Sequence, residues 1–136
     1  MKYIDSNFFI YAVASDTPEG HWCRSTLSRI MEGEFIGCTS TLTWDEIVYV
    51  LMKKINREIA LECSEYFLSL PNFRYIDVSP EILKSAHFIM TQYAMKPRDA
   101  IHAACMSHQG IDTIITEDTH FDRIPSVKRV WMNDIP

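Results

Sequence analysis

The feature of this sequence that most constrains its fold is the alternation of short apolar runs with longer segments of helical periodicity. The runs do not alternate apolar with polar residues, which is typical of strands that are buried on both faces of a sheet. Strands that alternate with helices in this way favour a parallel sheet. The predicted fold class is therefore α/β, with a five-stranded parallel sheet flanked by helices on both faces. The strands are expected at residues 2–5, 35–39, 74–78, 112–116 and 127–131.

The segments between these strands carry start and stop signals of helices. Ser6-Asn7 offers capping side chains before the apolar stretch 8–13, and Ser79-Pro80-Glu81 places proline at the first position of another helix. Lys53-Lys54 suits the negative end of a helix dipole. The helices are expected over 8–13, 18–33, 41–55, 56–70, 80–95 and 97–110, with a short helical turn over 120–124.

Length and composition indicate one compact domain that spans residues 1–136. The chain has 136 residues, of which 47% are hydrophobic, so it can bury a core without disulfides or structural metals. Its four cysteines form no C-x-x-C pair and lie in apolar or amphipathic runs, which favours buried, reduced thiols. No stretch is long or apolar enough to span a bilayer, and no signal-like region is found. We therefore expect a cytoplasmic protein that does not associate with membranes.

The formal net charge is -5, with 18 acidic residues against 13 lysines and arginines. A protein that binds nucleic acid by neutralising phosphates usually carries a basic face, so this balance weakens a nucleic-acid function. The objection loses force where carboxylates gather to bind divalent cations, because the cation offsets negative charge and itself meets the phosphate. Acidity therefore weakens such a function without excluding it.

Four acidic residues occupy positions suited to chemistry. Asp5 closes the first predicted strand, and Asp118 follows the fourth. Glu46 and Asp99 lie among apolar residues near the starts of two helices. Each also has a structural explanation. Asp5 can cap the helix that begins after Ser6, Asp118 can cap the turn that follows it, Asp99 can favour its helix dipole and Glu46 can be a surface residue.

Topology favours the functional interpretation of the four acids taken together. In open parallel sheets, ligands bind beyond the carboxyl ends of the strands, at the point where the strand order reverses. This would bring the ends of the first and fourth strands close together. Magnesium prefers oxygen ligands and is usually held by a few protein carboxylates, with substrate phosphate and water completing its shell. Such a site suits phosphodiester hydrolysis by a metal-activated water molecule.

Four stretches of the sequence also carry a family resemblance. Together, and in the same order and spacing, they resemble the PIN-domain family over nearly the whole chain, and most of all the single-domain PIN proteins of the VapC type, which are the toxin halves of prokaryotic toxin-antitoxin pairs. The stretches are Tyr3-Ile4-Asp5-Ser6-Asn7, Thr43-Trp44-Asp45-Glu46-Ile47, Pro97-Arg98-Asp99-Ala100-Ile101-His102-Ala103-Ala104 and Ile115-Thr116-Glu117-Asp118-Thr119-His120-Phe121-Asp122.

The resemblance implies an endoribonuclease that depends on magnesium or manganese and hydrolyses RNA. Asp5, Glu46, Asp99 and Asp118 match the acidic quartet of the family. Asp5, Asp99 and Asp118 are expected to bind the metal directly, while Glu46 binds a second ion or orients water. Known members are commonly homodimers that are inhibited by a small antitoxin protein, so the resemblance also implies these partners.

Further residues are expected to have supporting roles. The resemblance places Ser6 or Asn7 and Thr116 where the family often has polar support for the metal site, and makes Asp122 a candidate outer acid or, alternatively, a turn cap. The five histidines are interpreted as structural because none pairs with another at the spacing of a helical metal site. The alternative for His102 and His120, which follow Asp99 and Asp118 closely, is contact with the substrate phosphate. The candidate RNA contacts are Arg98, Lys53 and Lys54.

Other functions stay open at this point. A PIN domain can process RNA without being a toxin, or can act as a catalytically silent module that binds RNA or protein. A phosphatase of the haloacid-dehalogenase type or a receiver-like phosphoacceptor would also use an aspartate at the end of a parallel strand. Asp5-Ser6-Asn7 argues against the phosphatase, which requires a second acid two residues on.

Overall fold

A single parallel sheet runs through the middle of the molecule with its strands in the order β3-β2-β1-β4-β5. The computed structural model describes residues 1–132, and the last four residues of the predicted domain, 133–136, lie outside the described part. Every neighbouring pair of strands is parallel, so the five-stranded parallel sheet expected from the sequence is confirmed. The strands are β1 (Lys2–Ile4), β2 (Gly37–Ser40), β3 (Phe73–Ile76), β4 (Thr113–Ile115) and β5 (Lys128–Val130).

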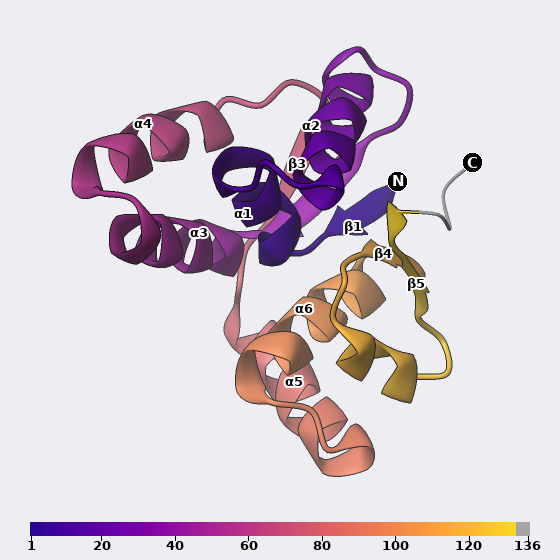
Figure 1. The fold of residues 1–136 in the computed structure, drawn as a ribbon. Helices are drawn as coiled ribbons and strands as arrows, with labels where there is room; N and C mark the ends of the chain where they lie inside the picture. Colours follow the sequence, from indigo (N-terminus) through magenta and orange to yellow (C-terminus); the bar gives the residue numbers. More distant parts are fainter. Residues whose placement is uncertain (133–136) are drawn as a thin grey trace.

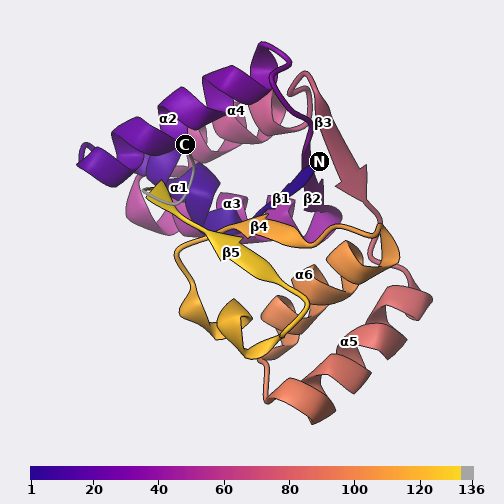
Figure 2. The same cartoon turned by 90° about the vertical axis from the view of Figure 1, so that its right-hand side faces the viewer.

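Helices cover both faces of this sheet, as Figures 1 and 2 show. Figure 2 places α1, α2 and α4 above the sheet and α5 and α6 below it, and α3 packs against α1 and α4. The close packing of α1 with α2, of α3 with α4 and of α5 with α6 follows from short connections between consecutive helices. The helices are α1 (Ser6–Ala14), α2 (Pro18–Met31), α3 (Thr41–Lys54), α4 (Arg57–Phe67), α5 (Pro80–Tyr93) and α6 (Pro97–His108), with the 3-10 helix η1 (Thr119–Arg123) between β4 and β5.

The start of α1 differs from the expectation that Ser6 and Asn7 cap the helix and agrees with the alternative that Asp5 caps it. The helix begins at Ser6, and its N-cap is Asp5, whose side chain accepts a hydrogen bond from the backbone N–H of Ser6. Ser6 and Asn7 therefore lie inside the first turn and do not cap it. The physical reason is that the strand is shorter than predicted, ending at Ile4, so the chain turns into the helix at the acid itself.

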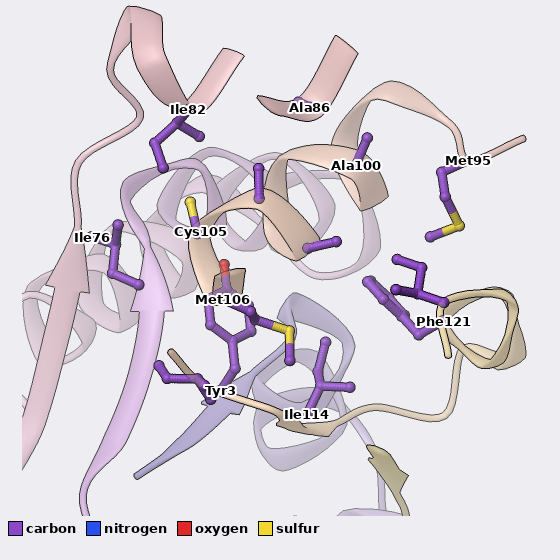
Figure 3. Packing of buried hydrophobic residues seen from close by; sticks show 14 of the residues in the cluster. Tyr3, Ile76, Ile82, Ala86, Met95, Ala100, Cys105, Met106, Ile114 and Phe121 are labelled. Carbon is purple, nitrogen blue, oxygen red and sulfur yellow. The ribbon is translucent and has the colours of Figure 1, made fainter. Parts of the chain in front are cut away.

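Alternate residues of the central strands point to opposite faces and build two hydrophobic cores. Tyr3 and Ile114 face α5 and α6, while Ile4 and Ile115 face the helices of the other layer. Figure 3 shows the first core, in which Tyr3 and Ile114 lie close to Met106 of α6. Several alanines of α6 are buried, and small side chains let this helix lie close against the sheet. The first turn of α6 is thereby brought to the carboxyl ends of the strands.

The thiols agree with the expectation of reduced cysteines. All four cysteines are free; Cys23, Cys38 and Cys105 are buried, whereas Cys63 is only half-buried. Burial raises the pKa of Cys23 and Cys105 to about 12 and that of Cys38 to about 11, so these thiols stay protonated at neutral pH. Within residues 1–132, no helix has the length and apolar character needed to cross a membrane.

Candidate active site

The candidate site lies at the carboxyl ends of β1 and β4, which pair with each other in the middle of the sheet. The strand order reverses here, because β2 follows β1 on one side and β4 lies on the other. Asp5 directly follows β1 and Thr116 directly follows β4. The backbone N–H of Asp5 donates to the carbonyl of Ile115 over 3.2 Å, so the ladder continues to the first acid. This is the switch point at which ligands bind in open parallel sheets.

Asp5, Glu46 and His102 form one group, whose ligand atoms lie within 4.8 Å of one another. Glu46 comes from the second turn of α3, and His102 comes from α6. Nε2 of His102 lies 2.7 Å from Oε1 of Glu46 and 3.6 Å from Oδ1 of Asp5. Two carboxylates from different layers of the fold are therefore held around one buried imidazole.

The other nitrogen of His102 is also engaged, because Nδ1 lies 2.7 Å from the hydroxyl of Tyr3. His102 is completely buried, so its side chain does not reach substrate. The interpretation of His102 as structural did not include its contacts with Glu46 and Asp5. The signal was present in the sequence: Asp99 and His102 are three residues apart and so share one face of α6. Tyr3 carried no such signal, since a tyrosine in a buried strand is ordinarily core.

Asp99, Asp118 and His120 form a second group, again with ligand atoms within 4.8 Å of one another. Asp99 lies in the first turn of α6, and Asp118 caps η1, where its Oδ1 accepts from the backbone N–H of His120 over 2.9 Å. Nδ1 of His120 lies 3.1 Å from Asp118 and 3.7 Å from Asp99. The capping role of Asp118 and its place in the acidic group are therefore both present.

Thr116 connects the two strand ends through its hydroxyl. It donates to Oδ2 of Asp5 over 2.8 Å and accepts from the side-chain amide of Asn7 over 2.9 Å and from the backbone N–H of Asp118 over 3.0 Å. Because its single proton goes to Asp5, Asn7 must present its nitrogen to Thr116. The carbonyl oxygen of Asn7 is then left buried without a hydrogen-bond partner.

The charges of the two acidic groups act on each other. Burial, followed by the charges of Asp118 and Asp5, raises the pKa of Asp99 to about 6. Burial likewise raises the pKa of Asp5, against the opposing effects of His102 and Thr116. Burial alone would lower the pKa of His102, but the hydrogen bond to Glu46 and the charge of Asp5, with other nearby acids, together raise it. The carboxylates repel one another and gain from any nearby positive charge.

The other residues predicted to support the site or contact RNA lie at separate places around it. The backbone N–H of Ser6 donates to Asp5 over 2.7 Å. Asp122 lies outside both acidic groups and pairs with Arg129, Oδ1 to Nε, at 3.0 Å. Arg98 is exposed in the first turn of α6, and Lys53 lies over the ring of Tyr49. Lys54 lines a cavity of about 550 Å³ beside Asn7.

A comparison with protein families matches residues 2–127 to the PIN domain. The chain belongs to the PIN-domain family. Among curated proteins, this PIN domain is 28% identical over 139 residues to Ribonuclease VapC13 of Mycobacterium tuberculosis, with 96% of this chain and 99% of that protein covered. A VapC ribonuclease of Mycobacterium bovis matches to the same extent.

Solved structures share the fold of this PIN domain. VapBC2 from Rickettsia felis, solved bound to a promoter DNA fragment, superposes with a TM-score of 0.75 at 19% identity, covering 97% of this chain and 100% of that one. VapC20 of Mycobacterium tuberculosis, a toxin that cleaves the sarcin-ricin loop, gives a TM-score of 0.75 at 15% identity, covering 88% and 91%. The recognition of a PIN-type, VapC-like chain from its sequence is confirmed.

The donor set of this PIN domain fits a divalent cation. Its acids offer only hard oxygen ligands, which is what magnesium and manganese prefer. Burial, together with the charges of Asp118 and Asp5, raises the pKa of Asp99, so a nearby cation would favour its ionised form. The unpartnered oxygen of Asn7 adds another hard donor beside Thr116. The residues present therefore fit the metal that the fold family implies.

Proposed function

We propose that this PIN domain is a metal-dependent endoribonuclease that hydrolyses RNA phosphodiester bonds, and that it is the toxin component of a VapBC-type pair. The observation that carries the proposal is that two groups of acids, Asp5 with Glu46 and Asp99 with Asp118, lie near the carboxyl ends of β1 and β4, where the charge of Asp5 also acts on Asp99. The similarity to curated VapC ribonucleases over the length of the chain supports the reaction and the substrate class.

Asp5, Asp99 and Asp118 would hold Mg²⁺ or Mn²⁺ directly, and Glu46 would bind a further ion or orient water. Such an ion, when bound, lowers the pKa of a water molecule and stabilises negative charge on phosphoryl oxygens. The protein supplies the orientation. Thr116 fixes one oxygen of Asp5, and His102 fixes one oxygen of Glu46, so neither carboxylate is free to turn away from the site.

The toxin role and the partners belong to the same proposal. Several structural neighbours were solved as toxin-antitoxin complexes, including those from Rickettsia felis, Klebsiella pneumoniae and Salmonella typhimurium. By analogy, the partners proposed for this chain are a small antitoxin protein and a second copy of the chain, with the nuclease acting in the cytoplasm. Induced expression in a bacterial host would then arrest growth, and Asp99→Asn would relieve the arrest.

The decisive experiment is cleavage of a panel of single-stranded and structured RNAs by purified protein, with Mg²⁺, with Mn²⁺ or with a chelator. Asp99→Asn is compared with Asp122→Asn, which makes the same chemical change outside the acidic groups. We expect cleavage that requires metal, is lost by a factor of about 100 or more in Asp99→Asn and is retained in Asp122→Asn. Cleavage that persists in chelator and in Asp99→Asn would contradict the proposal.

A further inference from the structure

We propose that the cavity between α1, α3 and the β4–η1 loop is a subsite for one nucleotide of the RNA, in which a base that donates hydrogen bonds is read by Glu117 and its phosphate is held by Lys54. The inference rests on the proposed ribonuclease function, because it names the part of the substrate that this site would bind. It adds a specificity pocket to a site that otherwise recognises only phosphate.

The cavity has the size and lining of a nucleotide site. Its volume of about 550 Å³ lies within the range of about 300–1000 Å³ that is usual for small-molecule sites. Aliphatic side chains form much of the wall, and one aromatic, one basic and one acidic side chain are added to them. The lining residues are Asn7, Ile10, Tyr11, Ala14, Ser15, Val50, Lys54, Ile55 and Glu117.

The cavity adjoins the acidic groups through a short chain of hydrogen bonds. Asn7 lines the cavity and donates to Thr116, and Thr116 donates to Asp5. Glu117, which also lines the cavity, stands in sequence between Thr116 and the acid Asp118. A nucleotide in the cavity would therefore place its neighbouring phosphodiester beside the carboxylates.

The polar groups in the cavity indicate how a base would be recognised. The hydroxyl of Tyr11 donates to Oε2 of Glu117 over 2.8 Å, which orients the carboxylate and the ring together. The hydrogen bond to Glu117 raises the pKa of Tyr11 to about 12, so the hydroxyl stays a donor. A carboxylate accepts hydrogen bonds only, and its remaining lone pairs suit the N–H groups of guanine, adenine or cytosine better than the edge of uracil.

The other walls suit the rest of the nucleotide. Single-stranded RNA is commonly bound by packing unstacked bases against aromatic and apolar side chains, and Tyr11, Ile10 and Val50 provide such a surface. Lys54 is exposed at the end of α3 and is the basic residue of the lining. An ammonium group at this place pairs with phosphate and offsets the negative charge of Glu117.

The first test measures binding of short labelled single-stranded RNAs by fluorescence anisotropy, with Mg²⁺, in the cleavage-deficient Asp99→Asn background. Lys54→Ala is compared with Lys84→Ala, which removes the same charge from α5 in the other helix layer. We expect Lys54→Ala to weaken binding and to reduce the slope of log Kd against log salt by about 0.7, the share of one phosphate contact. Lys84→Ala should leave both quantities unchanged.

The second test measures base preference by sequencing the ends of a random-sequence RNA cut by the otherwise wild-type protein. Glu117→Gln is compared with Glu62→Gln, an exposed residue of α4. A preference for guanine, adenine or cytosine over uracil at one position next to the cut should fall about tenfold in Glu117→Gln and persist in Glu62→Gln. All four variants alter exposed side chains, and matching thermal melts would establish that each is folded.

The outcomes separate this subsite from the nuclease function. Metal-dependent cleavage in which Lys54→Ala and Glu117→Gln behave as their controls would overturn the subsite and leave the ribonuclease standing. Base-dependent binding without any cleavage would overturn the ribonuclease and support the subsite. If both variants weaken binding of a co-expressed antitoxin but not of RNA, the cavity is a protein-binding site and the subsite proposal is wrong.

Discussion

Nε2 of His102 lies 2.7 Å from Oε1 of Glu46, and this contact joins α6 to α3 across the buried side of the acidic site. The opposite nitrogen contacts the hydroxyl of Tyr3, so both sides of the ring are used. With the ring neutral, Tyr3 donates to Nδ1 and Nε2–H donates to Glu46; with the ring protonated, both nitrogens donate. In either state the imidazole holds Glu46 in place.

Replacing His102 by alanine should destabilise the protein, because it leaves a cavity and removes the buried partners of Tyr3 and Glu46. We expect the free energy of unfolding to fall by about 3 kcal/mol in urea denaturation. His102→Gln, whose amide nitrogen can replace Nε2, should recover part of this loss and should bind metal more tightly than His102→Ala in calorimetric titrations. An alanine variant as stable as the parent would show that the ring makes no net contribution.

Thr116→Val tests the hydroxyl that connects Asp5, Asn7 and Asp118. The substitution preserves the shape of the side chain but leaves three polar groups without their partner. We expect about 2 kcal/mol less unfolding free energy and about tenfold weaker metal binding. Thr116→Ser retains the hydroxyl and serves as the control; if serine and valine reduce metal binding equally, the hydroxyl is not the cause.

The raised pKa of Asp99 predicts a pH dependence of stability in the presence of a chelator. Its pKa rises from 3.8 to about 6, so the folded state binds more protons than the unfolded state between these values. The contribution of Asp99 to stability is therefore present below pH 3.8 and is lost as the pH rises through about 6. Asp99→Asn removes this penalty, so its midpoint of thermal unfolding should exceed that of the parent at pH 8 by more than it does at pH 5. A difference independent of pH would contradict the shifted pKa.

Divalent metal should offset the same destabilising effect of ionised Asp99. A ligand that binds only the folded state stabilises it by mass action, so added Mg²⁺ or Mn²⁺ should raise the midpoint of thermal unfolding of the parent at pH 8. The increase should disappear in Asp99→Asn and remain in Asp122→Asn, whose carboxylate pairs with Arg129. An equal response of all three proteins would place the bound ion elsewhere.

The positions of most strands and helices can be predicted from local sequence. Buried strands read as continuous apolar runs, and Pro80 and Pro97 mark helix starts because proline lacks the N–H that the first turn does not use. The position of Asp5 at a strand end was predictable for the same reason. The error at the start of α1 is also local, since Asp5, Ser6 and Asn7 are all good capping residues and the sequence does not choose among them.

Tertiary structure alone decided which of these residues meet. Thr116 and Asp5 are 111 residues apart and His102 and Glu46 are 56 apart, and their contacts exist because β4 pairs with β1 and α6 packs beneath them. Periodicity shows that a face is buried but not which other face covers it. The spacing of Asp99 and His102 therefore could not show that His102 contacts Glu46 of α3, and no local pattern could place Asp122 beside Arg129. The sequence determined the elements and their chemistry, while long-range packing determined the site.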